Sequence, residues 1–235
     1  MTWAKPRRMS EDAAKKAAGY AAAGFVKSGM RVGLGTGSTA FFAVQAVGEA
    51  WLAGALRDLV VVATSERTAA QSRGYNLPLK DLSEVGALDI TIDGADEVDD
   101  HLTLIKGAGG ALLREKIVAC ASTEMVVVVD PSKLVQRLGS RYPVPVEVEP
   151  FGWQVTLRQL GTLGCEPVLR LNADGTPYRT DGGHYTVDCR FAEIPDAAAL
   201  ETSIKAFPGA LECGLFVGIA KRVVVGEPTG TRVIG

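Results

Sequence analysis

The side chains best suited to proton chemistry in this sequence are carboxylates, and two of them lie close together after one apolar run. Asp93 ends the run LDITID (residues 88–93), and Asp96 follows three positions later, beyond a Gly94-Ala95 turn. This spacing lets both carboxylates face one site. The segment does not follow the calcium-binding EF-hand loop, because it lacks the glycine and the final glutamate of that pattern. A solvated acidic turn is the alternative interpretation.

A second candidate group combines a lysine, a glycine-rich loop and a glutamate in KGAGGALLREKI (residues 106–117). Lys106 ends a short apolar segment, and the loop leads into a helix in which Glu115 lies about one turn from the start. The Glu115 side chain can therefore reach the end of the loop. An isolated glutamate on a helix usually faces solvent, but here a lysine, a glycine loop and two aspartates are expected to converge with it.

The segment GTGSTA (residues 35–40) follows an apolar run and opens a helix, an arrangement that can hold an anion. Small residues let backbone N–H groups approach the ligand, and Thr36, Ser38 and Thr39 add hydroxyl donors. A dinucleotide-binding loop would need glycine in place of Ser38, and a P-loop would need a lysine. A simple helix cap needs only one hydroxyl, so phosphate binding is favoured. Lys133, after a later strand, is either a solvated charge or a second phosphate contact.

These groups together favour proton transfer beside the carbonyl of a phosphorylated small molecule. A carboxylate would remove the proton, and nearby donors would stabilise the enediolate that forms. The two histidines, His101 and His184, do not fall in these loops. The four cysteines are too widely spaced for a metal site, so buried free thiols are expected and no metal is expected.

Strands and helices alternate over the first 130 residues, which predicts a mostly parallel sheet with helices on both faces. Ligands of such sheets bind at the carboxyl ends of the strands, where the three loops are expected to lie. Ser10 can cap the first helix and Gly29 can end it. Strands are expected at 30–35, 59–64, 88–93, 102–106 and 125–130, and helices at 10–28, 38–53, 66–74 and 111–121.

The pattern changes at RYPVPVEVEP (residues 141–150), where two prolines in three residues indicate a domain boundary or an edge strand. The apolar segment from residue 215 onward is expected to return to the first sheet. The expected fold class is therefore α/β, with a Rossmann-like domain from residues 1–140 and 215–235 and a smaller α+β domain from residues 141–214. The smaller domain is expected to contain an antiparallel hairpin, with helices at 152–163 and 196–206 and strands at 167–171, 176–180 and 184–191.

Composition excludes several other classes of protein. The 235 residues are 47% hydrophobic and 22% charged, with a net charge of −2, so no broad basic surface for nucleic acid is expected. No apolar run approaches the roughly 18 residues of a membrane span. The N-terminal arginines precede no apolar stretch of the kind found in secretory signals, so a cytoplasmic location is expected.

Seven segments, in this order, resemble the type A ribose-5-phosphate isomerase family over roughly residues 10–230. They are GLGTGSTA, TSERT, DGADEVD, KGAGGALLREKI, DPSK, PVPVEV and GLFVG. The resemblance implies interconversion of D-ribose 5-phosphate and D-ribulose 5-phosphate in the non-oxidative pentose phosphate pathway. It also implies a Rossmann-like domain with a small ferredoxin-like domain, no metal or organic cofactor, and a homodimer or a tetramer.

The same resemblance implies roles for individual residues. Glu115 matches the proton-shuttling base, and Asp93, Asp96 and Lys106 match the remaining catalytic groups, with one aspartate assisting ring opening. Lys15 matches, more weakly, a lysine near the phosphate. The substrate-binding positions implied are Thr36, Gly37, Ser38, Thr39, Asp93, Gly94, Ala95, Asp96, Lys106, Gly107, Ala108, Gly109 and Lys133.

One position departs from the family pattern, and it bears on loop geometry. Ala108 stands where many members have glycine, and alanine adopts positive φ less readily. The alternatives to an isomerase are an amino-sugar-phosphate deaminase or lactonase, which would be expected to use a histidine, and a sugar-phosphate-sensing module, which would need no base. A dinucleotide-binding oxidoreductase is disfavoured by Ser38.

Overall fold

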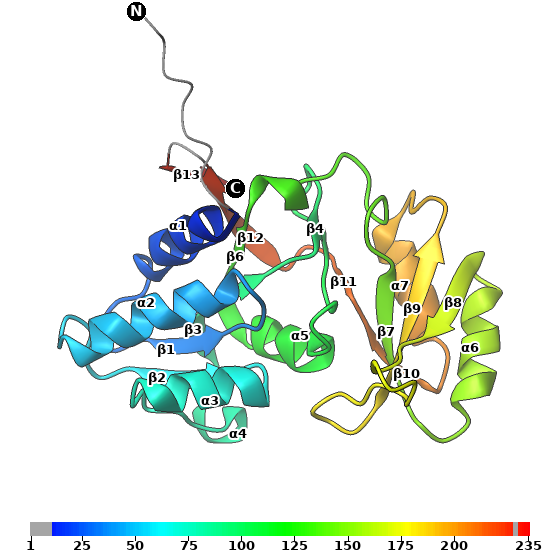
Figure 1. Cartoon of the computed structure of the whole chain (residues 1–235), viewed down its shortest axis with the longest axis horizontal. Helices are drawn as coiled ribbons and strands as arrows, with labels where there is room; N and C mark the ends of the chain where they lie inside the picture. Colours follow the sequence, from blue (N-terminus) through cyan, green and yellow to red (C-terminus); the bar gives the residue numbers. More distant parts are fainter. Residues whose placement is uncertain (1–10, 228–229) are drawn as a thin grey trace, which may run out of the picture.

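The protein folds around a central sheet and a separate, smaller sheet, as Figure 1 shows. The structure, a computed structural model, describes residues 11–227 and 230–235. Ser10, the expected helix cap, lies outside these residues. The first helix, α1 (Glu11–Ala23), ends earlier than expected, because Gly24 and Phe25 continue only as tight turns. Among the described helices, none has the length and apolar character needed to span a membrane.

The central sheet has six strands in the order β13-β12-β6-β3-β1-β2. All neighbouring strands are parallel except β12 and β13, so the sheet is mostly parallel, as the alternation of elements predicted. The antiparallel edge strand β13 was not predicted from the sequence. The bounds are β1 (Arg31–Leu34), β2 (Val60–Ala63), β3 (Leu88–Gly94), β6 (Ser122–Val129), β12 (Ala220–Glu227) and β13 (Gly230–Ile234).

Helices cover both faces of this sheet, and successive side chains of β6 pack alternately against the helices of one face and of the other. Val126 and Val128 pack in one core cluster with residues of α1 and α2 (Ala40–Leu52). Met125 and Val127, on the opposite face, pack in another cluster with Ala119 of α5 (Leu112–Cys120). All four β6 side chains are at most 1% exposed, which is why this strand is apolar at every position from Met125 to Val129. The remaining helices of this region are α3 (Glu66–Gly74) and α4 (Leu82–Val85).

A three-stranded antiparallel sheet lies beside the central one and carries the third candidate loop. Its strands are β4 (Glu97–Val98), β5 (Leu104–Ile105) and β11 (Leu215–Phe216), in the order β11-β5-β4. The first two candidate loops follow the parallel strands β1 and β3. The loop from Lys106 instead follows β5, which is shorter than the strand expected at 102–106 and belongs to this separate sheet. The short 3₁₀ helix η1 (Pro131–Lys133) follows β6.

The smaller domain is a four-stranded antiparallel sheet with two helices, which confirms the expected α+β unit. The strand order is β10-β7-β9-β8. The strand bounds are β7 (Val144–Val148), β8 (Cys165–Leu169), β9 (Tyr185–Phe191) and β10 (Ala210–Cys213), and the helices are α6 (Trp153–Gly161) and α7 (Ala197–Lys205). Strands β8 and β9 pair antiparallel, but a long connection over residues 170–184 joins them, not the tight turns expected from the sequence. Residues 176–180 are not a strand, because only one isolated bridge, between Leu171 and Pro177, forms in that segment.

The edge-strand interpretation of residues 141–150 is wrong, because β7 pairs with β9 on one side and β10 on the other. Pro145 is tolerated at this internal position for a geometric reason. Its carbonyl accepts the N–H of Gly214 at 2.7 Å, and the N–H and C=O of one residue point to the same side of a strand. The missing N–H of Pro145 therefore faces Gly214, just beyond the end of β10, and removes no bond from the ladder.

Candidate active site

The three candidate loops meet at one small cavity of about 80 Å³. The cavity lies where β1 and β3 end, with the loop after β5 and the start of α5 completing its wall. Of the site residues expected from the sequence, Asp93, Ala108 and the more weakly matched Lys15 are not part of the lining. The lining residues are Thr36, Gly37, Ser38, Thr39, Gly94, Ala95, Asp96, Lys106, Gly107, Gly109, Glu115 and Lys133.

Lys106 lies between two buried carboxylates. Its Nζ is 3.1 Å from Asp93 Oδ2 and 3.1 Å from Glu115 Oε2, and it donates to the carbonyl of Gly94 at 2.5 Å. The side chains of Asp93, Lys106 and Glu115 are 0%, 2% and 3% exposed. One ammonium group cannot neutralise two carboxylates in such a dry site, so ionisation of both acids at once is unfavourable.

This arrangement gives Glu115 an unusual affinity for a proton. Burial raises the pKa of Glu115 to about 8, and the charge of Asp93 adds to that rise, whereas Lys106 opposes it. Burial also raises the pKa of Asp93, against the opposing effect of Lys106. For Lys106, burial acts to lower the pKa, but the charges of Asp93 and Glu115 outweigh it and raise the pKa. Lys106 thus stays a cation, and Glu115 can both hold and release a proton near neutral pH.

Asp93 is fixed by the backbone rather than exposed to the cavity. Its Oδ1 accepts the N–H groups of Thr36 at 2.9 Å and Gly94 at 2.7 Å. Gly35 makes this possible, because a Cβ there would lie 2.1 Å from Asp93 Oδ1. Asp93 does not line the cavity, so it acts on the site through its ion pair with Lys106.

Asp96 reaches the cavity and also holds the third loop. Its Oδ2 accepts the N–H of Ala108 at 2.9 Å, and its own N–H donates to the carbonyl of Ile105 at 2.8 Å. The Ala108 amide is therefore occupied by Asp96 and not free for a ligand, and Ala108 does not adopt a positive φ. Alanine in place of the usual family glycine leaves the shape of the cavity unaffected at this position.

The loop before α2 presents an uncapped helix N-terminus to the cavity. Thr39 occupies the N-cap position, but its side chain forms no capping hydrogen bond. The hydroxyl of Thr36 is also committed to the protein, because it bonds the hydroxyls of Thr64 and Ser65 at 2.8 and 2.7 Å. Thr36 therefore does not offer the hydroxyl expected from the sequence. The donors left for an anion are backbone N–H groups and the hydroxyls of Ser38 and Thr39, both of which line the cavity.

Lys133 contributes the second cation of the cavity. Its Nζ bonds Tyr142 Oη at 2.8 Å and lies 4.5 Å from the centre of the Tyr142 ring. Lys15, in contrast, is not among the lining residues, and its Nζ pairs with Glu11 at 2.5 Å. Lys133 is thus the lysine that the structure places beside the anion-binding loop.

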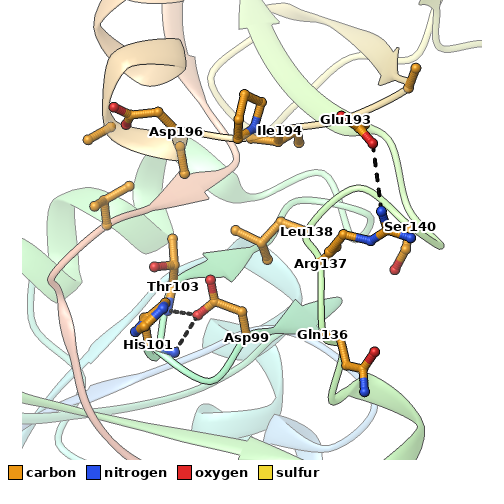
Figure 2. Close-up of a pocket in the computed structure, with 15 residues that line it drawn as sticks. Asp99, His101, Thr103, Gln136, Arg137, Leu138, Ser140, Glu193, Ile194 and Asp196 are labelled. Carbon is orange, nitrogen blue, oxygen red and sulfur yellow. Dashed lines mark hydrogen bonds and ion pairs between the residues drawn. The ribbon is translucent and has the colours of Figure 1, made fainter.

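A larger cavity, of about 870 Å³, lies elsewhere, between residues 99–103, 136–140 and 192–198 (Figure 2). Asp99 there accepts the backbone N–H groups of His101 and Thr103. Arg137 and Glu193 form an ion pair at 3.6 Å, but their side chains are 83% and 75% exposed. No buried reactive group converges on this cavity among the described residues, so we place the candidate active site in the smaller one.

The cysteines are free but not uniformly buried: Cys189 and Cys213 are buried, Cys165 is half-buried and Cys120 is exposed. Among the described residues, one group could offer a metal three ligands: Glu201, Glu212 and Cys213. Lys116 Nζ already occupies that position, at 2.6 Å from Glu201 and 2.8 Å from Glu212. This cluster is therefore a satisfied ion-pair network that links α5 to the smaller domain.

Two residues of the smaller domain that the sequence analysis missed contact the third loop. Arg170 donates to the carbonyl of Gly107, and Tyr178 packs against Gly110. Both residues are far from the loop in the sequence; Arg170 is 63 positions after Gly107. No local pattern marked them, because their contact depends on how the smaller domain packs against the larger one.

Comparison with known proteins agrees with this geometry. A family model described as ribose 5-phosphate isomerase A (phosphoriboisomerase A) matches residues 60–230. A ribose-5-phosphate isomerase A of Gloeobacter violaceus is 52% identical, covering 96% of this chain and 97% of the relative. The corresponding protein of a Synechococcus species is 49% identical, covering 96% of this chain and 98% of the relative.

The fold is matched as closely as the sequence. A solved D-ribose-5-phosphate isomerase in complex with phospho-erythronic acid superposes with a TM-score of 0.94 at 36% identity, covering 96% of this chain and 99% of that one. These matches extend over the central sheet and the smaller domain alike. The chain therefore belongs to the type A ribose-5-phosphate isomerase family.

Proposed function

We propose that this protein interconverts D-ribose 5-phosphate and D-ribulose 5-phosphate by proton transfer through an enediolate, with Glu115 as the base. The observation that carries the proposal is the buried Glu115 carboxylate, 3.1 Å from Lys106, on the wall of a cavity that also contains an anion-binding loop. Membership of the isomerase family supports the choice of substrate. The complex of a solved relative with phospho-erythronic acid, a small phosphorylated acid, fits the same kind of site.

The phosphate is assigned to the start of α2. The uncapped N–H groups there, the hydroxyl of Ser38 and the ammonium group of Lys133 surround one side of the cavity. A helix N-terminus and a lysine together favour a dianion. Binding the phosphate at this end directs the other end of the sugar toward Lys106 and Glu115.

The reaction begins with ring opening, and we assign Asp96 to it. The bond between C1 and the ring oxygen breaks, the ring oxygen gains a proton, and the hydroxyl on C1 loses one to become the aldehyde. Asp96 is the aspartate that lines the cavity, whereas Asp93 is fully buried behind Lys106. Asp93 instead keeps Lys106 charged and in place.

Isomerisation then needs one base and one cation. Glu115 takes the proton from C2, a double bond forms between C1 and C2, and negative charge develops on the C1 oxygen. The Lys106 ammonium group stabilises that charge in a site from which water is largely excluded. The proton of the C2 hydroxyl then passes to the C1 oxygen, and Glu115 returns its own proton to C1 as the C2 carbonyl forms, which gives the ketose. A base with a pKa of about 8 can carry out both transfers near neutral pH.

The test of this function is turnover by the purified protein after treatment with a chelator. We expect ribulose 5-phosphate to form from ribose 5-phosphate, and no ammonia to form from an amino-sugar phosphate. Binding of ribose 5-phosphate without turnover would overturn the isomerase assignment and favour a sugar-phosphate sensor. Ammonia release without isomerisation would favour a deaminase.

We also propose that the protein acts as a homodimer in the cytoplasm. The family resemblance supports the dimer, and the exposed apolar side chains of Phe151 and Val168, 90% and 62% exposed, are compatible with a further contact. Light scattering on the purified protein tests the assembly. A mass of one chain over the whole micromolar range would contradict the dimer.

A further inference from the structure

An arginine of the smaller domain binds the backbone of the loop that carries Lys106. Nη1 of Arg170 donates to the carbonyl of Gly107 at 2.9 Å and to the carbonyl of Ala108 at 3.3 Å. Arg170 follows β8, at the start of the long connection to β9. Figure 1 shows this connection extending from the smaller sheet toward α5.

The arginine is itself held in one orientation. Its Nε and Nη2 donate to the two carboxylate oxygens of Asp188, at 2.9 and 2.5 Å, and it lies 5.8 Å from the centre of the Tyr178 ring. The Arg170 side chain is 16% exposed. A two-pronged pair of this kind fixes the plane of the guanidinium group and directs Nη1 to the loop carbonyls.

The bound carbonyls decide where the loop amides point. A trans peptide unit is planar, and its C=O and N–H point in opposite directions. The carbonyl of Gly107 faces Arg170, and the N–H of the same peptide, on Ala108, donates to Asp96. The carbonyl of Ala108 also faces Arg170, so the N–H of Gly109 points the other way.

That direction is toward the cavity. Gly109 lines the cavity, and its N–H donates to no protein atom in the part of the chain that the structure describes. The neighbouring Gly110 donates to the carbonyl of Gly107 at 3.0 Å, which closes the turn. Tyr178 packs tightly here, because a Cβ on Gly110 would lie 2.0 Å from Tyr178 Oη. The smaller domain thus supports the outer side of the loop.

We propose that Arg170 is a positioning residue for the isomerisation: anchored by Asp188, it holds the loop carbonyls so that the Gly109 N–H donates to a sugar oxygen beside Lys106. This inference rests on the proposed function and assigns the smaller domain a part in the reaction. Arg170 does not line the cavity and acts only through the loop. The Gly109 amide serves the reacting end of the sugar, because its loop begins at Lys106 rather than at the phosphate-binding segment.

The test compares Arg170→Ala and the double variant Arg170→Met/Asp188→Asn with a matched control. The double variant removes both charges and so leaves no unpaired carboxylate, which protects folding. The control, Arg179→Ala, removes an arginine from the same connection; among the described residues this arginine bonds Gly183 and Tyr185 and not the loop. Thermal melting identifies the folded variants, and initial rates at varied ribose 5-phosphate give kcat and KM for each.

We expect kcat/KM to fall by about 10²-fold in both Arg170 variants, the size of effect seen when a supporting residue shifts a reacting group by about 1 Å. The control should stay within about twofold of the unchanged protein. Inorganic phosphate, used as a competitive inhibitor, should bind all variants alike, because Arg170 does not touch the phosphate loop. Millimolar guanidinium should restore part of the activity of Arg170→Ala and should not change the activity of Arg179→Ala.

Several results would overturn the proposal. A kcat/KM within about twofold of the unchanged protein in either Arg170 variant would remove any positioning role. Parallel loss of phosphate affinity, or the same loss in Arg179→Ala, would show a general structural effect instead. If the unchanged protein fails to isomerise ribose 5-phosphate, the proposed function fails rather than this inference alone.

Discussion

The pH dependence of kcat/KM tests the buried environment of Glu115. Burial and the charge of Asp93 raise the pKa of this carboxyl to about 8, whereas an ordinary glutamate ionises near pH 4.5. A base must be ionised to take a proton, so kcat/KM should rise with pH through this range. A general acid in the same position would give the opposite slope.

The size of the rise follows from the ionised fraction of Glu115. With a pKa of about 8, roughly one molecule in ten carries the Glu115 charge at pH 7, and about nine in ten do so at pH 9. We therefore expect kcat/KM to increase about tenfold between pH 7 and pH 9, and to level off above that. With an ordinary glutamate pKa the change over the same range would be negligible.

The assay is the initial rate of ketose formation at ribose 5-phosphate concentrations well below KM. Work above pH 7 keeps the substrate phosphate in one state, since the second ionisation of a phosphate monoester lies near pH 6. Circular dichroism over the same pH range controls for unfolding. A flat profile, or a decrease between pH 7 and pH 9, would refute the assignment of Glu115 as a buried base.

Three further substitutions probe the site from different sides. Glu115→Gln should have a higher melting temperature than the unchanged protein at pH 9. Folding raises the Glu115 pKa from 4.5 to about 8, so the unchanged protein loses stability as the pH increases between these values. The variant has no carboxyl group at this position and does not lose this stability. An advantage that shrinks from pH 6 to pH 9 would contradict this. Lys133→Met should raise KM about tenfold or more, with little change in kcat, because it removes a charged phosphate contact. Lys221→Met, at an exposed lysine outside the cavity, is the control. An equal KM in both variants would reject the role of Lys133. Ala108→Gly should leave kcat/KM within about twofold, because the amide of residue 108 is already occupied by Asp96. It should lower stability by roughly 0.5–1 kcal/mol, because glycine loses more conformational freedom on folding. A tenfold change in its kcat/KM would show that this peptide contacts the substrate.

Much of the candidate site could be predicted from the sequence because its residues lie beside strand ends. The parallel arrangement of β1 and β3 places the segments after Leu34 and Gly94 next to each other. The spacing from Lys106 to Glu115 spans one loop and one helical turn, so their contact follows from local structure. Contacts between residues this close in the sequence can be predicted from the sequence alone.

The parts that could not be predicted depend on long-range packing. The Thr36 hydroxyl looked free for a ligand, but the approach of α3 engages it with Ser65 and Thr68. Pro145 looked like an edge-strand residue, yet it lies in an internal strand. Proline is tolerated there because β10 ends beside it. Arg170 carried no motif, since its role depends on the contact between two domains.

The most direct test of the central claim is kcat for Glu115→Gln. Glutamine keeps the shape of the side chain but cannot take the proton from C2, so kcat should fall by at least about 10²-fold while inhibition by inorganic phosphate stays unchanged. Glu166→Gln, at an exposed glutamate of β8, should behave like the unchanged protein. A kcat for Glu115→Gln close to that of the unchanged protein would contradict the account, because Glu115 would then not be the base.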